Sequence, residues 1–268
     1  MPKVSVIIPN YNHGEFLPEA VASVTSLKPE GAEIIVVDDG STDERTRREV
    51  DSLEASGIHV IRQANKGLAA ARNAAITASK GEYIFPLDAD DRARPIPILR
   101  AIHVLDTQPT VGVVYGDAAL FGVRSGCWAA GSFSPARLMK KNFISCSALF
   151  RRTVWEQVGG YDGTMPVQGL EDWDFWIGAY EHGWRFAYLP EPLFDYRQHH
   201  ASMLTNARRF EQEINEFVAS KHGILYRREW MQLASERESG RATFRNLRRI
   251  VKERIKHKLG MNGSHGQS

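Results

Sequence analysis

The chain has 268 residues, of which 43% are hydrophobic and 25% charged, with a formal net charge of +2. This composition indicates an ordinary globular protein with one large domain, or one domain and an extension. We expect neither a membrane span nor a signal peptide, because no apolar run is long enough and an apolar strand begins directly at Val4. The only two cysteines, Cys127 and Cys146, lie in neither a metal-binding nor a redox spacing, which predicts a reducing, cytoplasmic location.

Apolar, β-branched runs alternate with helix-like segments through the first third of the chain. Strands are predicted at residues 4–8, 33–38, 59–61 and 83–87, and helices at 16–27, 42–56 and 68–79. Continuously apolar strands are typical of a parallel sheet that helices cover on both faces. The predicted fold class is therefore α/β.

Polar residues follow each of these strands. They occupy residues 9–12, 38–43, 65–67 and 88–91. Because ligands bind outside the carboxyl ends of parallel strands, we expect these segments to converge on one cleft. After residue 111 the pattern loosens into short strands at 113–115, 148–150, 186–189 and 193–196, around an aromatic-rich stretch at 171–182. A mixed sheet would accommodate them.

The carboxyl-terminal part of the chain is predicted to be helical. Residues 1–206 form the expected main domain, 207–259 a helical extension and 260–268 a disordered tail rich in Gly, Ser and Asn. Residues 241–259 carry eight Lys or Arg against one acid, with apolar residues at helical spacing. Such a basic amphipathic helix fits an anionic membrane surface, and the alternative is a helix docked on its own domain or on another subunit. Nucleic acid is a less suitable partner, because no recognised nucleic-acid module accompanies the helix.

The segment Asp88-Ala89-Asp90-Asp91 ends an apolar strand in three carboxylates. Asp88 and Asp90 project to one side of an extended chain, and such a cluster is costly without a cation. Mg²⁺ or Mn²⁺ bound by one or two carboxylates usually completes its shell with water and phosphate oxygens, which points to a nucleotide-diphosphate ligand. The alternative is a solvated Asp-rich turn.

Seven short motifs, taken in order, resemble those of the family 2 inverting glycosyltransferases over roughly residues 3–203. They are Pro9-Asn10-Tyr11-Asn12, Val37 to Asp43, Asn65-Lys66-Gly67 with Ala71-Arg72-Asn73, Asp88 to Asp91, Gly159-Gly160-Tyr161-Asp162, Glu171-Asp172, and Tyr196-Arg197 with His199. The resemblance implies a GT-A fold, which is Rossmann-like with a mixed, mostly parallel sheet flanked by helices. It also implies a nucleotide-sugar donor, with a UDP-sugar favoured.

The resemblance assigns a group of residues to the nucleotide. They are Pro9, Tyr11, Asn12, Asp39, Asn65, Lys66, Arg72 and Asp88. Asp39 would accept a hydrogen bond from the base, whereas Asp38 is interpreted as structural. The 65–67 segment opens a helix whose free N–H groups, together with Arg72, could face the nucleotide or its diphosphate. The alternatives are a simple turn at Gly67 and an internal ion pair between Arg72 and an aspartate.

The resemblance also implies a divalent cation, Mn²⁺ or Mg²⁺, with Asp90 as the main ligand and Asp91 in support. His199 would be a second ligand or a phosphate donor, and its neighbour His200 leaves that choice open. The ion would neutralise the charge that develops on the leaving nucleoside diphosphate.

A single displacement with inversion requires a base opposite the leaving group, and Asp172 matches the family position for it, with Glu171 orienting it or contacting acceptor. The alternative is that these acids only favour a helix start near Trp173. Trp173 and Arg197 are assigned to acceptor or sugar, although an aromatic at this spacing also fits core packing. Oligomeric state is left open.

The predicted function is transfer of a sugar from a nucleotide sugar to a hydroxyl of a glycan or lipid-linked acceptor. One rival is a nucleotidyltransferase that makes nucleotide sugars, but the residues after the first strand are not the Gly-rich, basic loop that it usually carries. A second rival is a non-catalytic carbohydrate-binding protein on a degenerate transferase fold. A dinucleotide-dependent dehydrogenase is disfavoured, because no Gly-x-Gly-x-x-Gly follows the first strand. We expect one sugar per encounter, because the Gln-x-x-Arg-Trp signature of many processive relatives is missing.

Overall fold

The computed structural model describes residues 2–27, 31–199, 210–228 and 231. The predicted basic helix at 241–259 and the predicted tail at 260–268 lie outside these residues, as does His200. Within them, no helix is both long and apolar enough to cross a membrane.

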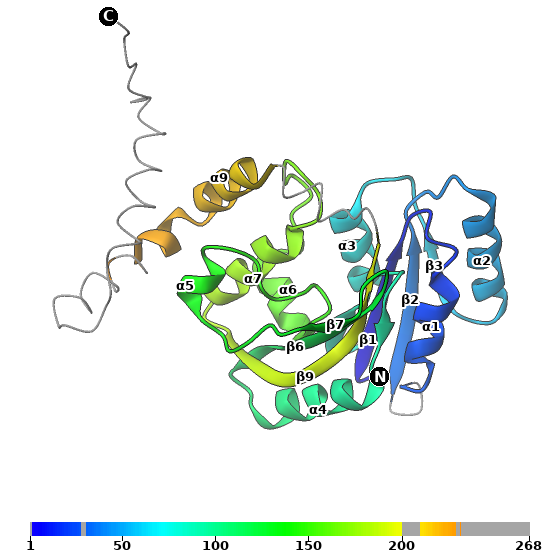
Figure 1. The fold of residues 1–268 in the computed structure, drawn as a ribbon, viewed down its shortest axis with the longest axis horizontal. Coiled ribbons are helices and arrows are strands. Elements are labelled where there is room, and N and C mark those ends of the chain that lie inside the picture. The colour runs from blue at the N-terminus through cyan, green and yellow to red at the C-terminus, as the bar shows by residue number, and fades with distance from the viewer. Residues whose placement is uncertain (1, 28–30, 200–209, 229–230, 232–268) are drawn as a thin grey trace, which may run out of the picture. The chain divides into compact units, whose positions relative to one another are not determined.

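The first part of the chain alternates strands and helices as predicted (Figure 1). The elements are β1 (Val4–Asn10), α1 (Leu17–Thr25), β2 (Ala32–Asp38), α2 (Glu44–Ala55), β3 (His59–Arg62), α3 (Leu68–Ala78) and β4 (Tyr83–Pro86). β1 pairs in parallel with both β2 and β4, and β2 with β3. In this register Asn10 lies beside Asp38, so the loops after the two strands start at the same edge of the sheet.

The second part extends the sheet with antiparallel pairings and with one parallel pairing, between β6 and β9. Its elements are β5 (Arg92–Ala93), α4 (Pro95–Thr107), β6 (Val111–Gly122), β7 (Gly126–Trp128), α5 (Pro135–Leu138), β8 (Leu149–Arg151), α6 (Arg152–Val158), α7 (Glu171–Glu181), β9 (Arg185–Gln198) and α9 (Glu211–Lys221). The strand order is β3-β2-β1-β4-β8-β6-β9-β5, with β7 attached to β6. The prediction of an α/β fold with a mixed sheet is confirmed.

One prediction about individual elements is wrong, and one helix was missed. The strands expected at 186–189 and 193–196 form the single strand β9, which pairs with β6 and shifts its register between Leu189 and Pro192. Prolines are tolerated at such an irregularity, because a residue there need not donate to the ladder. Helix α4 was not predicted, although Pro95 at its first position and the buried Ile98 and Ile102 are typical helix signals.

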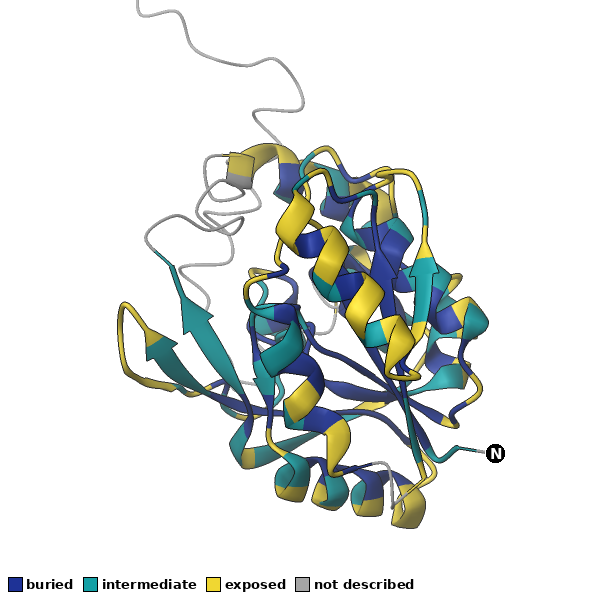
Figure 2. Ribbon diagram, turned by 90° about the vertical axis from the view of Figure 1, so that its right-hand side faces the viewer, coloured by how far each residue is buried: buried dark blue, intermediate teal, exposed yellow. Residues whose placement is uncertain are grey.

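Helices cover both faces of the sheet, and Figure 2 shows buried strands between helices whose outer sides are exposed. One core cluster joins Val6 and Ile8 of β1 to α1 and α4. On the other side, Phe150 of β8 contacts the rings of Phe175 and Trp176 of α7. This packing fixes α7 against the sheet, with its first turn at the strand ends.

Helix α9 belongs to the compact unit that is built on the sheet, which runs to His222. Its Ile214 and Val218 are fully buried. Lys221 bridges Asp162 and Asp174, so the end of α9 is tied to α7 by charge as well as by apolar packing.

Candidate active site

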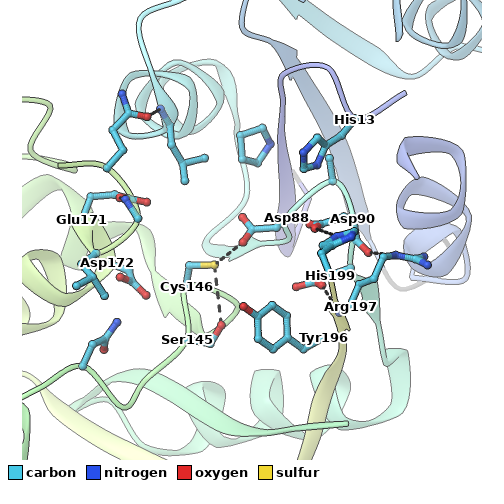
Figure 3. A pocket seen from close by; sticks show the side chains of 18 of the residues that line it. His13, Asp88, Asp90, Ser145, Cys146, Glu171, Asp172, Tyr196, Arg197 and His199 are labelled. Atoms are coloured by element: carbon cyan, nitrogen blue, oxygen red, sulfur yellow. Dashed lines mark hydrogen bonds and ion pairs between the residues drawn. The ribbon is translucent and has the colours of Figure 1, made fainter. Parts of the chain in front are cut away.

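A cleft of about 1580 Å³ lies at the carboxyl ends of the central strands. All but one of the predicted site residues line it: Pro9, Tyr11, Asn12, Asp39, Asn65, Arg72, Asp88, Asp90, Asp91, Glu171, Asp172, Trp173, Arg197 and His199. Lys66 is the exception and lines a small neighbouring recess. The predicted convergence of the strand ends on one cleft is therefore confirmed. In Figure 3, Glu171 and Asp172 lie on one side of the pocket, Asp90 and His199 on the other, and Asp88 and Cys146 between them.

Asp39, directly after β2, is buried where the cleft meets the start of α3. Its Oδ1 accepts hydrogen bonds from Gln63 Nε2 at 2.6 Å and from the Lys66 N–H at 2.9 Å, and its Oδ2 accepts from the Gly67 N–H at 2.8 Å. A carboxylate oxygen can accept more than one hydrogen bond, so Oδ2 retains capacity for a ligand. The neighbouring Asp38 turns away and accepts from Asn10 and from the Ser41 N–H.

The free N–H groups that we expected at the start of α3 are not free. The Asp39 carboxylate accepts hydrogen bonds from the N–H groups of Lys66 and Gly67, and Gln168 Oε1 accepts one from the Leu68 N–H at 3.2 Å. The first turn of a helix leaves its N–H groups without partners inside the helix, and here protein oxygens satisfy them. The expectation that they face a diphosphate is corrected accordingly, whereas the exposed Lys66 side chain stays a predicted nucleotide contact.

Arg72 of α3 is 1% exposed and joins two parts of the site. Its guanidinium forms an ion pair with Glu171 at the start of α7 and a second, at 2.9 Å, with Asp88 after β4. The internal ion pair, which the sequence left as an alternative, is what the structure shows. Arg72 thus fixes two carboxylates of the cleft relative to one another, and its charge is neutralised within the protein.

Asp90 and His199 are the best placed residues for a divalent cation. His199 Nε2 lies 2.8 Å from Asp90 Oδ2, and both side chains are partly exposed at the cleft. The Asp90 carboxylate is a suitable ligand for Mn²⁺ or Mg²⁺, with diphosphate oxygens and water completing the shell, whereas the His199 imidazole is a softer ligand that would bind the ion directly or donate to a phosphate oxygen. The described residues contain no group of three or more His, Cys, Asp or Glu that would hold an ion alone. The donor set therefore fits a cation shared with a phosphate ligand.

Asp91 is 2% exposed, and burial, reinforced by Asp90 and Asp88, raises the pKa of its carboxyl well above the usual range. Its Oδ1 accepts a hydrogen bond from the Arg197 N–H at 2.8 Å. Asp91 thereby ties the 88–91 segment to β9, which carries His199, and its supporting role at the cation stays a prediction.

Arg197, which was assigned to acceptor or sugar, is occupied by the protein. Its guanidinium lies between the rings of Phe16 and Phe121, forms an ion pair with Glu19 and donates from Nε to the Asp90 carbonyl at 2.8 Å. Arg197 holds the backbone of the segment that carries Asp90, so its contacts favour a positioning role over the predicted contact with sugar or acceptor.

Asp172 lies at the start of α7, is 8% exposed and has no salt-bridge partner among the described residues. Burial, with a smaller contribution from Glu171, raises the pKa of its carboxyl to about 7. The Asn142 side chain and the Trp173 N–H donate hydrogen bonds to it. A carboxyl group with this pKa can accept a proton at neutral pH.

The neighbours of Asp172 have structural contacts. Glu171 is paired with Arg72 and also accepts from the Gly169 N–H, so it holds the loop before α7. Trp173 is 2% exposed and donates from Nε1 to the Leu138 carbonyl at 2.5 Å. This exposure is too small for a sugar to stack on the ring, and the core-packing alternative describes Trp173 better.

Three residues of the site were not predicted. The Cys146 thiol lies 3.4 Å from Asp88 Oδ2, and burial, followed by the charge of Asp88, raises the pKa of this thiol well above its usual range. Gln168 caps α3, and Asn142 contacts Asp172. All three lie in loops with no periodic pattern, and their positions depend on contacts distant in sequence.

Comparison with known proteins agrees with this architecture. The model of glycosyl transferase family 2 matches residues 5–159, more than half of the chain. The putative glycosyltransferase EpsE of Bacillus subtilis is 31% identical over 206 residues, which cover 74% of this chain and 73% of EpsE. The uncharacterized glycosyltransferase alr2836 of Nostoc sp. is 40% identical over 116 residues, which cover 42% of this chain and 36% of that protein.

Among solved structures, residues 1–349 of S. aureus TarS in complex with UDP-GlcNAc superpose with a TM-score of 0.62 and 20% identity. The match covers 76% of this chain and 60% of that one, and the same part of TarS has also been solved with UDP. At this identity the likeness shows the shared GT-A fold. The family match and the similarity to EpsE together establish that the chain belongs to glycosyl transferase family 2.

Proposed function

We propose that the protein is an inverting glycosyltransferase that moves a sugar from a nucleoside-diphosphate sugar to a hydroxyl of a glycan or lipid-linked acceptor. The observation that carries the proposal is Asp172, whose carboxyl group has a pKa of about 7 and lies across the cleft from Asp90 and His199. A base on one side and a leaving-group site on the other is the arrangement that a single displacement requires. S. aureus TarS, which shares the fold, binds UDP-GlcNAc, and this favours a UDP-sugar as donor.

The donor would lie along the strand ends. Asp39 would accept a hydrogen bond from the base, near Tyr11 and Asn65, and Asp88 would lie beside the ribose. Asp90 and His199 would hold a divalent cation together with the diphosphate, and this cation would supply positive charge for the leaving group. Arg72 and Arg197 would act indirectly, because they fix Asp88 and the backbone of Asp90.

The acceptor would approach from the Asp172 side. Its hydroxyl oxygen would form a bond to the anomeric carbon while its proton passes to the Asp172 carboxylate. The bond between that carbon and the diphosphate oxygen would break, and the nucleoside diphosphate would leave with the bonding electrons. Attack opposite the leaving group inverts the anomeric configuration.

Ligand-induced thermal stabilisation tests the donor part of this proposal. We expect one nucleoside diphosphate, most simply UDP, to raise the melting temperature with Mn²⁺ and much less with a chelator. Asp90→Ala should remove the dependence on Mn²⁺, whereas Asp51→Ala, which changes a carboxylate of α2 away from the cleft, should retain it. Stabilisation by no nucleotide, or an unchanged metal dependence in Asp90→Ala, would contradict it.

The stereochemistry is tested separately by ¹H NMR of the product. The coupling constant of the new anomeric proton distinguishes inversion from retention, and a retained configuration would overturn the role of Asp172 as base. The predicted cytoplasmic location and the membrane contact of residues 241–259 stay predictions that vesicle binding of the full chain, compared with a chain that ends before residue 241, would test.

A further inference from the structure

The cleft has a basic rim beside Asp172 that the proposed mechanism does not use. Lys140 and Lys141 line the cleft, and both are exposed. Their backbone N–H groups both donate to the Arg137 carbonyl at 3.1 Å, which closes a tight turn. The turn is flanked by the buried residues Met139 and Phe143, so the backbone that carries the two lysines is firmly held.

This turn is attached to the first residues of α7. On one side of the lysines, the Leu138 carbonyl accepts from Trp173 Nε1 at 2.5 Å, and on the other side Asn142 donates to Asp172. Residues 138–142 therefore contact both Asp172 and Trp173, and the two lysines lie in the middle of this segment. A ligand with a hydroxyl at Asp172 would lie beside the turn that carries both lysines, which line the same cleft.

Neither lysine has a salt-bridge or hydrogen-bond partner for its ammonium group in the part of the chain that the structure describes. Arg72 and Arg197, which also line the cleft, differ from the lysines because both are held in ion pairs. Arg124, in the turn between β6 and β7, adds a third exposed cation to the lining. The rest of the cleft is lined by six acidic side chains, of which Asp88 and Glu171 are paired with Arg72: Asp39, Asp88, Asp90, Asp91, Glu171 and Asp172.

From this arrangement we infer that the acceptor carries an anionic group next to the hydroxyl that reacts, and that Lys140 and Lys141 bind that group. An anion that approaches this acidic cleft is repelled unless cations stand at its point of entry. The donor diphosphate is a less suitable partner, because its expected site at Asp90 and His199 lies on the other side of the pocket from Asp172 (Figure 3). The inference rests on the proposed function, since it takes the Asp172 side as the acceptor side.

The test is the binding of three methyl glycosides to the full chain, measured by saturation-transfer NMR with UDP and Mg²⁺ present. They are methyl β-D-glucoside, methyl β-D-glucuronide and methyl β-D-glucoside 6-phosphate, which share a ring and differ in one charged group. We expect at least one anionic glycoside to bind about tenfold more tightly than the neutral one at low salt, and the preference to shrink as salt rises. A preference for the glucuronide or for the phosphate identifies a carboxylate-bearing or a phosphate-bearing acceptor.

Lys140→Gln/Lys141→Gln should reduce the anionic preference to about twofold or less and leave the affinity for UDP unchanged. The matched control is Arg48→Gln/Lys80→Gln, which removes two exposed cations outside the cleft and should keep the preference. Equal binding of the three glycosides, binding of none, or an unchanged preference in the lysine variant would overturn the inference. A lysine variant that loses affinity for UDP would instead assign the pair to the donor. Failure of UDP itself to bind the unaltered chain would count against the proposed function, so the two failures are distinguishable.

Discussion

Three carboxylates lie in the first turn of α7, and they differ in whether a cationic side chain is paired with them. Glu171 is paired with Arg72, and Asp174 is paired with both Lys221 and His222. Asp172, which lies between them in sequence, has no such partner among the described residues. Pairing with a cation keeps a buried carboxylate ionised and fixed, whereas burial without one raises the pKa, here to about 7. The same helix start thus supplies two structural anchors and one group suited to proton transfer.

The largest effect is expected for Asp172→Asn, which removes the unpaired carboxylate and keeps its shape. Transfer should fall by about 10³-fold, because the acceptor proton loses its base. Donor affinity should be retained, since the donor residues lie elsewhere in the cleft. Initial rates of transfer and UDP titrations measure the two quantities. Transfer within tenfold of the unaltered enzyme would remove Asp172 as the base.

Asp172→Asn also tests the difference between the carboxylates of α7 through its effect on the melting temperature. The folded-state pKa of Asp172 lies above its ordinary value, so its ionisation destabilises the fold progressively as pH rises toward 7. Asp172→Asn should therefore raise the melting temperature more at pH 8 than at pH 5. Asp174→Asn is the matched control and should lower it, because Lys221 and His222 would lose their partner. A drop in both variants would contradict the distinction between the two carboxylates.

Arg72→Gln tests the paired carboxylate, Glu171, because it removes the cation with which Glu171 is paired. It leaves the buried Glu171 and the partly exposed Asp88 without their cation and should cost about 3 kcal/mol of unfolding free energy. Urea denaturation measures the loss. Arg62→Gln, which removes an exposed arginine that also bridges two acids, should cost less than about 1 kcal/mol. Equal costs in the two variants would show that the buried bridge is not specially important.

A smaller effect is expected in the pH profile of the unaltered enzyme. At saturating donor, transfer should rise about tenfold between pH 6 and pH 8 as the Asp172 carboxyl ionises with a pKa of about 7. Donor affinity should be followed over the same range, so that a change in donor binding is separated from a change in the rate of transfer. A rate that is flat from pH 6 to pH 8 with constant donor affinity would contradict the raised pKa.

The sequence predicted the convergence of strand ends because apolar runs and polar segments recur in a regular order from Val4 to Asp91. It also predicted many of the residues that line the cleft, since the family motifs mark them, but not Asn142, Cys146 or Gln168. It did not predict what those residues contact. The N–H groups at Lys66 and Gly67 were expected to meet a ligand, and Arg72 was assigned to the nucleotide, because spacing along the chain does not show that Asp39 and Glu171 reach them first. Such pairings depend on how α3, α7 and the loops between strands pack in three dimensions.

The smallest effect is expected at His222, on the side of α7 away from the cleft. Its Nδ1 lies 2.8 Å from Glu181 and its Nε2 2.9 Å from Asp174, so both nitrogens can donate only when the ring is protonated. Burial lowers the pKa of the ring, but hydrogen bonds to Asp174 and Glu181 outweigh it and raise the pKa above 6.5. The stabilisation is therefore fully present below pH 6.5 and is lost as pH rises through the raised value.

His222→Gln should cost about 1 kcal/mol at pH 6 and less at pH 9, measured by urea denaturation, with His103→Gln on the exposed side of α4 as control. A cost that grows with pH would show that the neutral ring, rather than the imidazolium, joins α9 to α7.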